Sequence, residues 1–419
     1  MPKTDSLKST LEPATKTLKV LFICHDGALY GSQESLLQLI SSLNPQEITV
    51  YVSIARPGPL VEKLEALPQV HVLHHQRIGW FKHDPRSGLA RICDILSLIY
   101  SCLFRLTGTM THIHQYDIEL VHTNSVVSLE GALAAWLMRI PHVWHIRELF
   151  YWDNPKLFPT LGKRLTRFII ECLSSRILCI SSAVQKQFNA VSKAVLVPNA
   201  FLPPPESSAI LNRDYLLPTE SQCLFQLGYV GRISEGKRLH LLLQALSLLK
   251  QQHSSFPFHL TVVGGFVDVP YQTLIETMIQ DLDLSKHVNL VGYQTKEVLY
   301  QYYAQWDCLV LPSLNEPFGR VLIEAMSFGL PCIASNSGGV PDIITQLDVG
   351  VLFQPDSAED LAAQLNALFF VPDTVLAAKH RQAISQAARR SALDRFNIES
   401  HKASILSVYK ACLTRQESI

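Results

Sequence analysis

The sequence predicts an α/β protein that contains two parallel, doubly wound sheets. Short β-branched apolar runs alternate with helical segments from Leu18 to about Val197, and the alternation resumes at Cys223 after a proline-rich interruption. Alternation of this kind is typical of parallel sheets that are covered by helices on both faces. Two such halves enclose a cleft, and ligands of these sheets lie beyond the carboxyl ends of the strands.

Each half contains several apolar runs of strand length. In the first half, strands are expected at 18–24, 48–55, 70–73, 118–123, 142–146, 176–180 and 194–198. In the second half, they are expected at 223–230, 258–264, 288–292, 308–312, 331–335 and 350–353. Helical candidates lie between them, and a long helical region closes the chain at about 374–415.

The chain is expected to contain two domains joined by a linker. Residues 201–222 contain Pro203, Pro204, Pro205 and Pro218 without a regular period, which indicates an interdomain connection. The expected segments are a disordered tail at 1–17, an N-terminal α/β domain at 18–200, the linker at 201–222, a C-terminal α/β domain at 223–390 and a helix at 391–419 that returns toward the N-terminal domain.

The composition excludes some classes of protein. The 419 residues are 47% hydrophobic and 17% charged, which is typical of a globular chain. The 36 Lys and Arg residues balance 36 Asp and Glu residues, so no overall field favours nucleic acid, and no nucleic-acid partner is expected. The nine cysteines include no C-x-x-C pair and suit a reducing compartment, so a cytoplasmic location is expected.

Two further segments bear on membranes. The polar residues 1–17 lack the apolar core of a signal peptide. The longest apolar stretch, 89–106, contains Arg91, Asp94 and Arg105, which makes it too polar for a membrane span. We expect this stretch to be a helix that packs on a sheet.

The stretch GYVGRISEGKRL at 228–239 resembles the start of a phosphate-binding P-loop. Gly231, Gly236 and Lys237 fit G-x-x-x-x-G-K, but Arg238 stands where a P-loop has Ser or Thr for Mg²⁺. P-loop proteins have a second nucleotide-binding motif, an apolar strand that ends in Asp, and the sequence contains no such strand. Arg232 and Lys237 precede a helix, whose amino end favours anions, so they are candidates to neutralise a diphosphate without a metal. The alternative is an ordinary turn with solvated basic residues.

A pair of carboxylates lies in the stretch 311–341. Glu316 is in a loop after a strand, and Glu324 lies about one turn inside a helix that begins near Gly319. Because that helix is apolar nearly all round, a carboxylate in it requires a partner. A carboxylate accepts hydrogen bonds from adjacent hydroxyls, as in a ribose, and the helix amino end offers free N–H groups to phosphate. The alternatives are a helix-dipole role for Glu324 and a solvated loop acid at Glu316.

These motifs resemble a known family. E-x7-E from Glu316 to Glu324, with PFG between the acids, is followed by G-L-P and S-x-x-G-G-V-P, as in the retaining glycosyltransferases of family GT4. GYVGRISEGKRL is similar to their second hallmark. Upstream, the similar stretches are GSQESLL at 31–37, LVHTNS at 120–125, CISSAVQKQF at 179–188 and VPNA at 197–200. The resemblance implies the GT-B fold, with two Rossmann-like domains facing a cleft.

The resemblance also implies roles for residues. The C-terminal domain would hold a nucleotide-sugar and the N-terminal domain the acceptor. Arg232 and Lys237 would bind the donor diphosphate, Glu324 the ribose and Glu316 the transferred sugar. Backbone at Gly31, Phe318 and Gly319 would also approach the diphosphate, although the usual two glycines are Tyr30 and Gly31 here. His145, in HIRE, resembles a histidine near the reactive sugar carbon; the alternative is a histidine satisfied by local hydrogen bonds. The implied catalytic set is Glu316, His145, Arg232 and Lys237.

The expected function is therefore transfer, with retention of configuration, of a hexose-type sugar from a nucleotide diphosphate-sugar to a hydroxyl acceptor. The acceptor is expected to be a glycan or lipid-linked glycan of the cell envelope or an exopolysaccharide, and no cofactor or metal is expected. The alternatives are an epimerase or hydrolase of the same fold and a non-catalytic nucleotide-sugar-binding protein. Residues 157–173 combine Lys163, Arg164 and Arg167 with apolar residues, so they fit either peripheral contact with an anionic membrane or a helix that covers its sheet.

Overall fold

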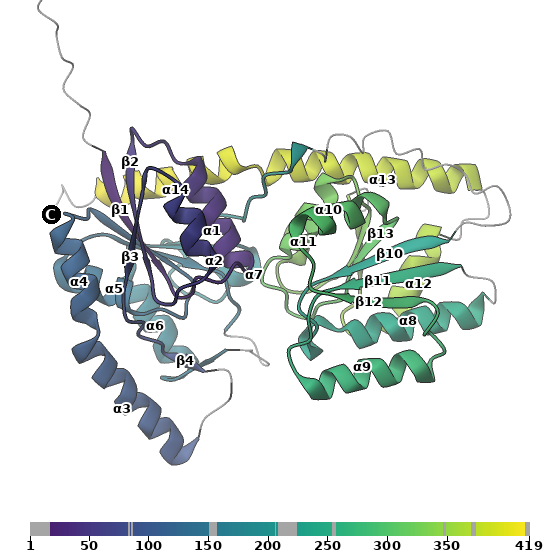
Figure 1. The fold of residues 1–419 in the computed structure, drawn as a ribbon, viewed down its shortest axis with the longest axis horizontal. Coiled ribbons are helices and arrows are strands. Elements are labelled where there is room, and N and C mark those ends of the chain that lie inside the picture. The colour runs from purple at the N-terminus through teal and green to yellow at the C-terminus, as the bar shows by residue number, and fades with distance from the viewer. Residues whose placement is uncertain are drawn as a thin grey trace, which may run out of the picture.

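The computed structural model describes residues 17–82, 84, 87–150, 157–205, 207, 224–253, 257–346, 349–369 and 374–414. Within them, two domains lie side by side, each built on a parallel sheet (Figure 1). The first sheet has seven strands in the order β3-β2-β1-β5-β6-β8-β9, and the second has six in the order β12-β11-β10-β13-β14-β15. The predicted fold class is confirmed. The tail at 1–16 and most of the expected linker lie outside the described residues.

The strands of the first domain follow the predicted apolar runs. They are β1 (Leu18–Cys24), β2 (Ile48–Ile54), β3 (Val70–His74), β5 (Leu120–Asn124), β6 (His142–Ile146), β8 (Arg176–Cys179) and β9 (Ala194–Leu196), with a separate antiparallel pair of β4 (Phe81–Lys82) and β7 (Phe158–Pro159). The helices are α1 (Gly31–Ser42), α2 (Pro59–Glu65), α3 (Gly88–Phe104), α4 (Leu106–Gln115), α5 (Glu130–Met138), α6 (Lys163–Leu173) and α7 (Ser182–Gln185). Because alternate side chains of buried strands point to opposite faces, both faces of the sheet are apolar and covered.

The second domain is built in the same way. Its strands are β10 (Phe225–Val230), β11 (Phe258–Val263), β12 (Val288–Gly292), β13 (Cys308–Leu311), β14 (Cys332–Ser335) and β15 (Val351–Phe353). Its helices are α8 (Leu239–Gln252), α9 (Val269–Asp281), α10 (Lys296–Gln305), α11 (Arg320–Ser327) and α12 (Ala358–Phe369), with 3₁₀ helices η2 (Glu235–Lys237) and η3 (Val340–Asp342). One core cluster joins α8, α9 and α12 to the sheet, while α11 packs on the opposite side.

The C-terminal helices connect the two domains. The helix α13 (Thr374–Arg395) runs along the second domain, and α14 (Ile398–Leu413) continues along the first (Figure 1). Buried residues of α14, among them Ile405 and Tyr409, pack in the same core cluster as α1 and α2. The Tyr409 hydroxyl lies 2.6 Å from Nδ1 of His122 in β5. The helix α14 thus forms part of the core of the first domain.

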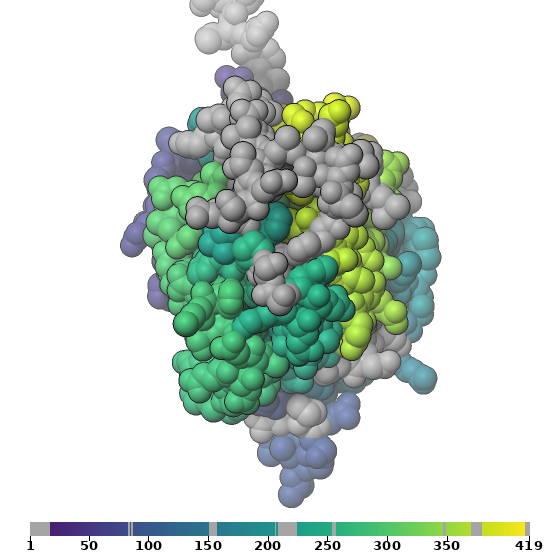
Figure 2. Space-filling view, turned by 90° about the vertical axis from the view of Figure 1, so that its right-hand side faces the viewer, coloured from purple at the N-terminus to yellow at the C-terminus, as the bar shows by residue number. Residues whose placement is uncertain are grey.

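Residues 89–106 were expected to form a helix that packs on a sheet. The helix is confirmed, but the expectation that a sheet covers its apolar face is wrong. The stretch is helical as α3, but this helix projects from the first domain in Figure 1 and buries only Leu98 and Ser101. Seven of its large hydrophobic side chains are more than half exposed. Figure 2 shows the end of α3 extending past the rest of the molecule, at the bottom of the view. The apolar period correctly indicated a helix, but it carries no information about what covers the apolar face.

Candidate active site

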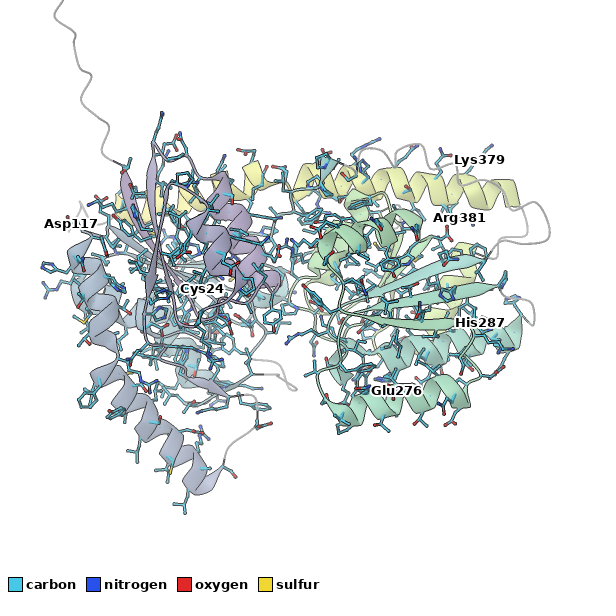
Figure 3. All side chains as sticks on the ribbon, viewed as in Figure 1. Cys24, Asp117, Glu276, His287, Lys379 and Arg381 are labelled. Atoms are coloured by element: carbon cyan, nitrogen blue, oxygen red, sulfur yellow. The ribbon has the colours of Figure 1, made fainter. Side chains whose placement is uncertain are left out.

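The candidate residues of the second domain lie at one edge of its sheet. The strands β10, β13 and β14 are parallel neighbours, and the loops that follow them carry Arg232 and Lys237, then Glu316, then Gly338. Carboxyl ends of parallel strands meet at a common edge, which is the ligand-binding edge of open α/β sheets. In Figure 3, His287, just before β12, marks the opposite edge, on the side away from the first domain. The candidate loops therefore face the first domain.

Arg232 and Lys237 occupy a loop whose backbone depends on glycine. Gly231 has φ of +146°, and its carbonyl oxygen lies only 1.9 Å from the position that a Cβ on Gly264 would occupy. The loop ends in η2, which carries Lys237, and Arg238 then adopts φ of +56° before α8. Arg238 forms an ion pair with Asp356 at 2.8 Å. The residue that replaces the P-loop Ser or Thr is therefore used to hold the loop in place.

Lys237 and Glu316 are partners in the structure. The Lys237 Nζ donates a hydrogen bond to a carboxylate oxygen of Glu316, and both side chains are largely buried. The sequence predicts both as site residues, and the structure brings them together from loops that are 79 positions apart. A cation and a carboxylate that face each other at the sheet edge are well placed to separate around a ligand that has both phosphates and hydroxyls.

The S-x-x-G-G-V-P stretch fixes the position of the Glu316 backbone. A Cβ on Gly338, which has φ of +62°, would lie 2.1 Å from the Glu316 carbonyl oxygen, so only glycine fits there. The next residue, Gly339, donates its N–H to the same carbonyl at 2.8 Å. A Cβ on Gly339 would approach Ser181 of the first domain at 2.7 Å. The two glycines allow the Glu316 loop, the Gly338–Gly339 turn and Ser181 of the first domain to meet.

Glu324 has the partner that its buried position requires. It is 8% exposed in α11, and Arg320, one turn earlier, donates from Nε to its Oε1 at 2.8 Å. The carboxylate also raises the pKa of Tyr303, after the larger effect of burial. Sequence analysis did not assign a role to Arg320, although the i,i+4 spacing of Arg320 and Glu324 is a recognisable helix pair.

Phe318 and Gly319 lie at the amino end of α11. Phe318 is buried, and its ring packs edge-on against Phe396 with centroids 5.8 Å apart. Gly319 has φ of +103° and immediately precedes the helix. Phe318 thus anchors the loop in the core, while backbone N–H groups at the start of α11 are the groups that phosphate would use.

The amino end of α1 faces these residues from the first domain. Arg320 donates from Nη1 to the Gly31 carbonyl at 3.1 Å, and Lys296 of α10 forms an ion pair with Glu34 of α1. A Cβ on Gly31 would meet no atom within 4 Å, so space is open beside this turn. The ring of Tyr30 lies 5.9 Å from the guanidinium of Arg232. Position 30, where glycine is usual in the family, therefore places an aromatic ring beside Arg232, which is predicted to bind phosphate.

His145 lies inside the first domain. It is fully buried, and its ring is 5.4 Å from that of His122 and 6.1 Å from that of His401 on α14. Burial lowers the pKa of His145 well below its usual value, and the Arg147 cation lowers it further. The imidazole is therefore neutral at neutral pH. Its predicted role near the reactive carbon stays a prediction.

Arg147, two residues later, connects most of the upstream motifs. Its guanidinium donates to Asn124 Oδ1 at 2.6 Å, to Asn199 Oδ1 at 2.5 Å and to Ser35 Oγ at 3.2 Å. Burial lowers the pKa of Arg147 to about 10. GSQESLL, LVHTNS, HIRE and VPNA thus meet at one buried cation. Sequence analysis gave Arg147 no function, because its partners are far apart in the chain.

The remaining upstream motif, CISSAVQKQF, contacts the second domain. The backbone N–H and hydroxyl of Ser182, at the amino end of α7, donate to the Asp342 carboxylate at 2.6 and 2.7 Å. Asp342 belongs to η3, directly after S-x-x-G-G-V-P. Cys24, labelled in Figure 3, ends β1 at the edge of the first sheet that faces this interface. The two carboxyl edges therefore face each other across the interdomain contacts.

Among the described residues, no three or more His, Cys, Asp or Glu side chains are grouped so that they could hold a metal ion. None of the helices in the described part of the chain is long and apolar enough to cross a membrane.

The sequence of the second domain is similar to a known family. Residues 222–391 match the family described as glycosyl transferases group 1. The sulfoquinovosyl transferase SQD2 of Arabidopsis thaliana is 32% identical over 188 residues, which cover 42% of this chain and 33% of that protein. The amylovoran biosynthesis glycosyltransferase AmsK of Erwinia amylovora is 35% identical over 142 residues, covering 32% of this chain and 34% of that protein. The matched region thus spans about a third of the length of these two curated relatives.

Solved structures extend the likeness to both domains. HepE of Anabaena, solved in complex with UDP and glucose, has a TM-score of 0.71 and 20% identity over 94% of this chain and 99% of its own. The sucrose-phosphate synthase of Thermosynechococcus elongatus has a TM-score of 0.68 and 20% identity over 95% of this chain and all of its own. The chain therefore has the GT-B fold, and residues 222–391 in its second domain match the glycosyl transferases group 1 family.

Proposed function

We propose that the chain is a retaining glycosyltransferase that moves a hexose-type sugar from a nucleotide diphosphate-sugar to a hydroxyl acceptor. The observation that carries this proposal is the set of charged groups at the interdomain edge. Lys237 and Glu316 are paired there, Arg320 and Glu324 are paired in the helix that follows Glu316, and the amino end of α1 contacts Arg320. A diphosphate linked to two sugars presents both anions and hydroxyls, and this set offers partners for each.

In this proposal, binding of the donor rearranges the pair of Lys237 and Glu316. The diphosphate takes Lys237 and Arg232 as its cations, together with backbone N–H groups near Gly31, Phe318 and Gly319. Glu316, released from Lys237, accepts hydrogen bonds from the transferred sugar. Glu324, oriented by Arg320, accepts the ribose hydroxyls.

The charges then explain how transfer is accelerated. As the bond from the sugar carbon to the diphosphate breaks, negative charge grows on the leaving phosphate, and Arg232 and Lys237 stabilise it in a cleft that excludes water. The acceptor hydroxyl attacks from the same face, and the phosphate helps to take its proton. His145 lies in β6 with its Nδ1 3.4 Å from a guanidinium nitrogen of Arg147, and in this proposal it acts as a neutral group near the reactive carbon.

The known relatives support this reading and the class of acceptor. Solved structures of HepE contain UDP, UDP with glucose, and UDP-glucose, which supports a nucleotide-sugar donor. The relatives AmsK and SQD2 are named for amylovoran biosynthesis and sulfoquinovosyl transfer. We propose a glycan or lipid-linked glycan of the cell envelope or of an exopolysaccharide as acceptor. No observation favours an epimerase, a hydrolase or a non-catalytic binding protein.

We also propose a cytoplasmic location with peripheral contact with an anionic membrane. The cysteines that the structure describes are free thiols, which suits a reducing compartment. The basic helix α6 exposes Arg164, Leu165 and Phe168, a combination that suits anionic headgroups. Replacing Lys163, Arg164 and Arg167 with Gln should reduce flotation with anionic vesicles; unchanged flotation would remove α6 from the contact.

Release of free nucleotide from a panel of UDP-, GDP- and ADP-sugars, with EDTA present, tests the proposed function. We expect slow turnover of one donor, lost in Glu316→Ala and retained in Glu276→Ala, which removes an exposed acid on α9. Donor turnover that requires an added divalent metal would contradict the metal-independent chemistry. Hydrolysis of ATP with Mg²⁺, with every sugar donor inert and unbound, would contradict the proposal as a whole.

A further inference from the structure

The helix α3 presents an apolar face that no described part of the chain covers. Leu89 is 81% exposed and Leu103 is 68% exposed. The other large side chains that are more than half exposed are Ile92, Leu96, Ile99, Tyr100 and Phe104. Exposed apolar surfaces of this extent in a monomeric chain mark sites of interaction with a protein or a membrane.

The shape of this face favours a broad apolar partner. At 100° per residue, the seven side chains cover an arc of about 140° around the helix. Close packing of one helix on another uses a narrower seam, with contacts at alternate spacings of three and four residues. The arc also includes the aromatic pair Tyr100 and Phe104, whose ring centroids are 4.6 Å apart. A wide face with aromatic residues is typical of helices that lie in the interface of a bilayer.

The inner face of α3 is fixed to the first domain. Arg91 donates to the Thr160 carbonyl at 3.3 Å, and Asp94 forms an ion pair with Lys82 at 2.9 Å. Lys82 belongs to β4, and Thr160 directly follows β7. The helix is therefore held with its charged residues toward the protein and its apolar arc toward solvent.

The surroundings of this face are basic. The described residues of 82–105 and 163–173 contain six Lys and Arg residues and three Asp and Glu residues, a net charge of +3, although the whole chain has a net charge of zero. The two segments are adjacent, because the Arg91 guanidinium lies 3.1 Å from a Cβ position on Gly162, the residue before α6. The exposed face therefore combines apolar contact with a local attraction to anionic lipid.

We propose that the exposed face of α3 docks the chain onto an anionic lipid bilayer, with the helix lying along the headgroups and Leu89, Leu96 and Leu103 among the acyl chains. The inference rests on the peripheral membrane contact proposed above and names the element that provides the apolar part of it. It does not depend on catalysis, because docking is measured without a donor.

Flotation of the full chain with vesicles of phosphatidylglycerol and phosphatidylcholine, and with phosphatidylcholine alone, tests the proposal. The variant Leu96→Glu with Leu103→Glu places two charges on the face without filling a buried site. The matched control, Val267→Glu with Val269→Glu, places two charges on exposed apolar positions of the second domain, which are 56% and 72% exposed. Release of nucleotide from the donor is measured on the same preparations. It reports folding and the proposed function independently of docking, which flotation reports.

We expect the wild type and the control to float with anionic vesicles, and the α3 variant to bind on the order of tenfold less lipid while it retains nucleotide release. Equal flotation of the α3 variant and the wild type would overturn the assignment to α3. A wild type that does not float but sediments as a dimer, which the α3 variant converts to a monomer, would make this face an interface between copies. Flotation without any nucleotide release would leave docking in place and count against the proposed function instead.

Discussion

Arg320 connects the buried carboxylate of Glu324 to the other domain. Its Nε donates to Glu324 at 2.8 Å, and its Nη1 donates to the Gly31 carbonyl at the start of α1 at 3.1 Å. One side chain therefore orients the acid proposed for the ribose and holds the turn proposed to approach the diphosphate. The proposed donor site and the domain contact share this guanidinium.

Replacing Arg320 is expected to weaken donor binding without direct contact with the sugar. In Arg320→Ala, Glu324 loses the cation that compensates its burial, and hydrogen bonds to charged groups contribute about 1.5–3 kcal/mol each. We expect the KM for the donor to rise by roughly tenfold or more. Arg320→Lys should recover only part of the loss, because an ammonium does not span both partners as a guanidinium does. Steady-state kinetics in which KM is unchanged in both variants would contradict this role.

Lys237→Ala is expected to lower turnover much more than stability. Removing one group that stabilises developing charge lowers kcat on the order of 10²–10³-fold. The Lys237 and Glu316 side chains are 21% and 15% exposed, so water still reaches the carboxylate when Lys237 is removed, and the expected loss of folding stability is about 1–2 kcal/mol. The measurement is kcat together with thermal unfolding, with Lys286→Ala as an exposed control on the same domain. A large loss of Tm with a normal kcat would show a structural role instead.

Gly338→Ala is expected to disturb the site through the backbone. The new Cβ would lie 2.1 Å from the Glu316 carbonyl oxygen, at a φ of +62° that alanine disfavours. We expect a loss of stability of about 1–3 kcal/mol and a lower kcat, because the loop that carries Glu316 must move. Gly108→Ala, where a Cβ meets no atom within 4 Å, serves as the control and should leave both quantities unchanged or slightly raise stability. Wild-type activity and stability in Gly338→Ala would show that this contact is not needed.

The buried histidines are expected to make stability depend on acid pH. Burial lowers the pKa of His401 from 6.5 to about 4, so between these values the unfolded chain binds more protons than the folded chain. The stabilising contribution of neutral His401 is present above pH 6.5 and is lost as pH falls toward 4, by about 2 kcal/mol at pH 5.

His401→Asn tests this dependence. Nδ1 of His401 donates to the Pro198 carbonyl at 2.7 Å, and the Asn amide is placed to donate in the same way without titrating. Denaturant unfolding at pH 7.5 and pH 5 should show a smaller loss of stability in the variant than in the wild type. Equal losses would mean that His401 does not contribute to the acid sensitivity.

Local patterns in the sequence predicted the strands and the sheet edge that carries the candidate residues of the second domain. Each apolar run, such as 18–24 or 308–312, became a strand because burial on both faces leaves an unbroken apolar signature. The candidate acids and cations could be found because short motifs place them directly after strands. The pairing of Lys237 with Glu316 could not be predicted, because the two residues come from separate loops.

The features that the sequence did not predict have a common physical cause, which is that they depend on the three-dimensional arrangement of distant segments. The apolar period of α3 is the same whether a sheet, a bilayer or a second chain covers it, so its exposure could not be predicted. Arg147 joins Ser35, Asn124 and Asn199, which are brought together only by the order of the strands. Arg320 is an exception, because its spacing of four residues from Glu324 in one helix is visible in the sequence and indicates a pair.

Calorimetric titration of UDP, GDP and ADP into the wild type and Glu324→Ala, with EDTA present, tests the central claim most directly. The account predicts that at least one of these nucleotides binds the wild type, that its Kd rises on the order of 10- to 100-fold in Glu324→Ala, and that Glu276→Ala leaves it unchanged. Equal affinity of the wild type and Glu324→Ala for every nucleotide would place the donor elsewhere and contradict the account.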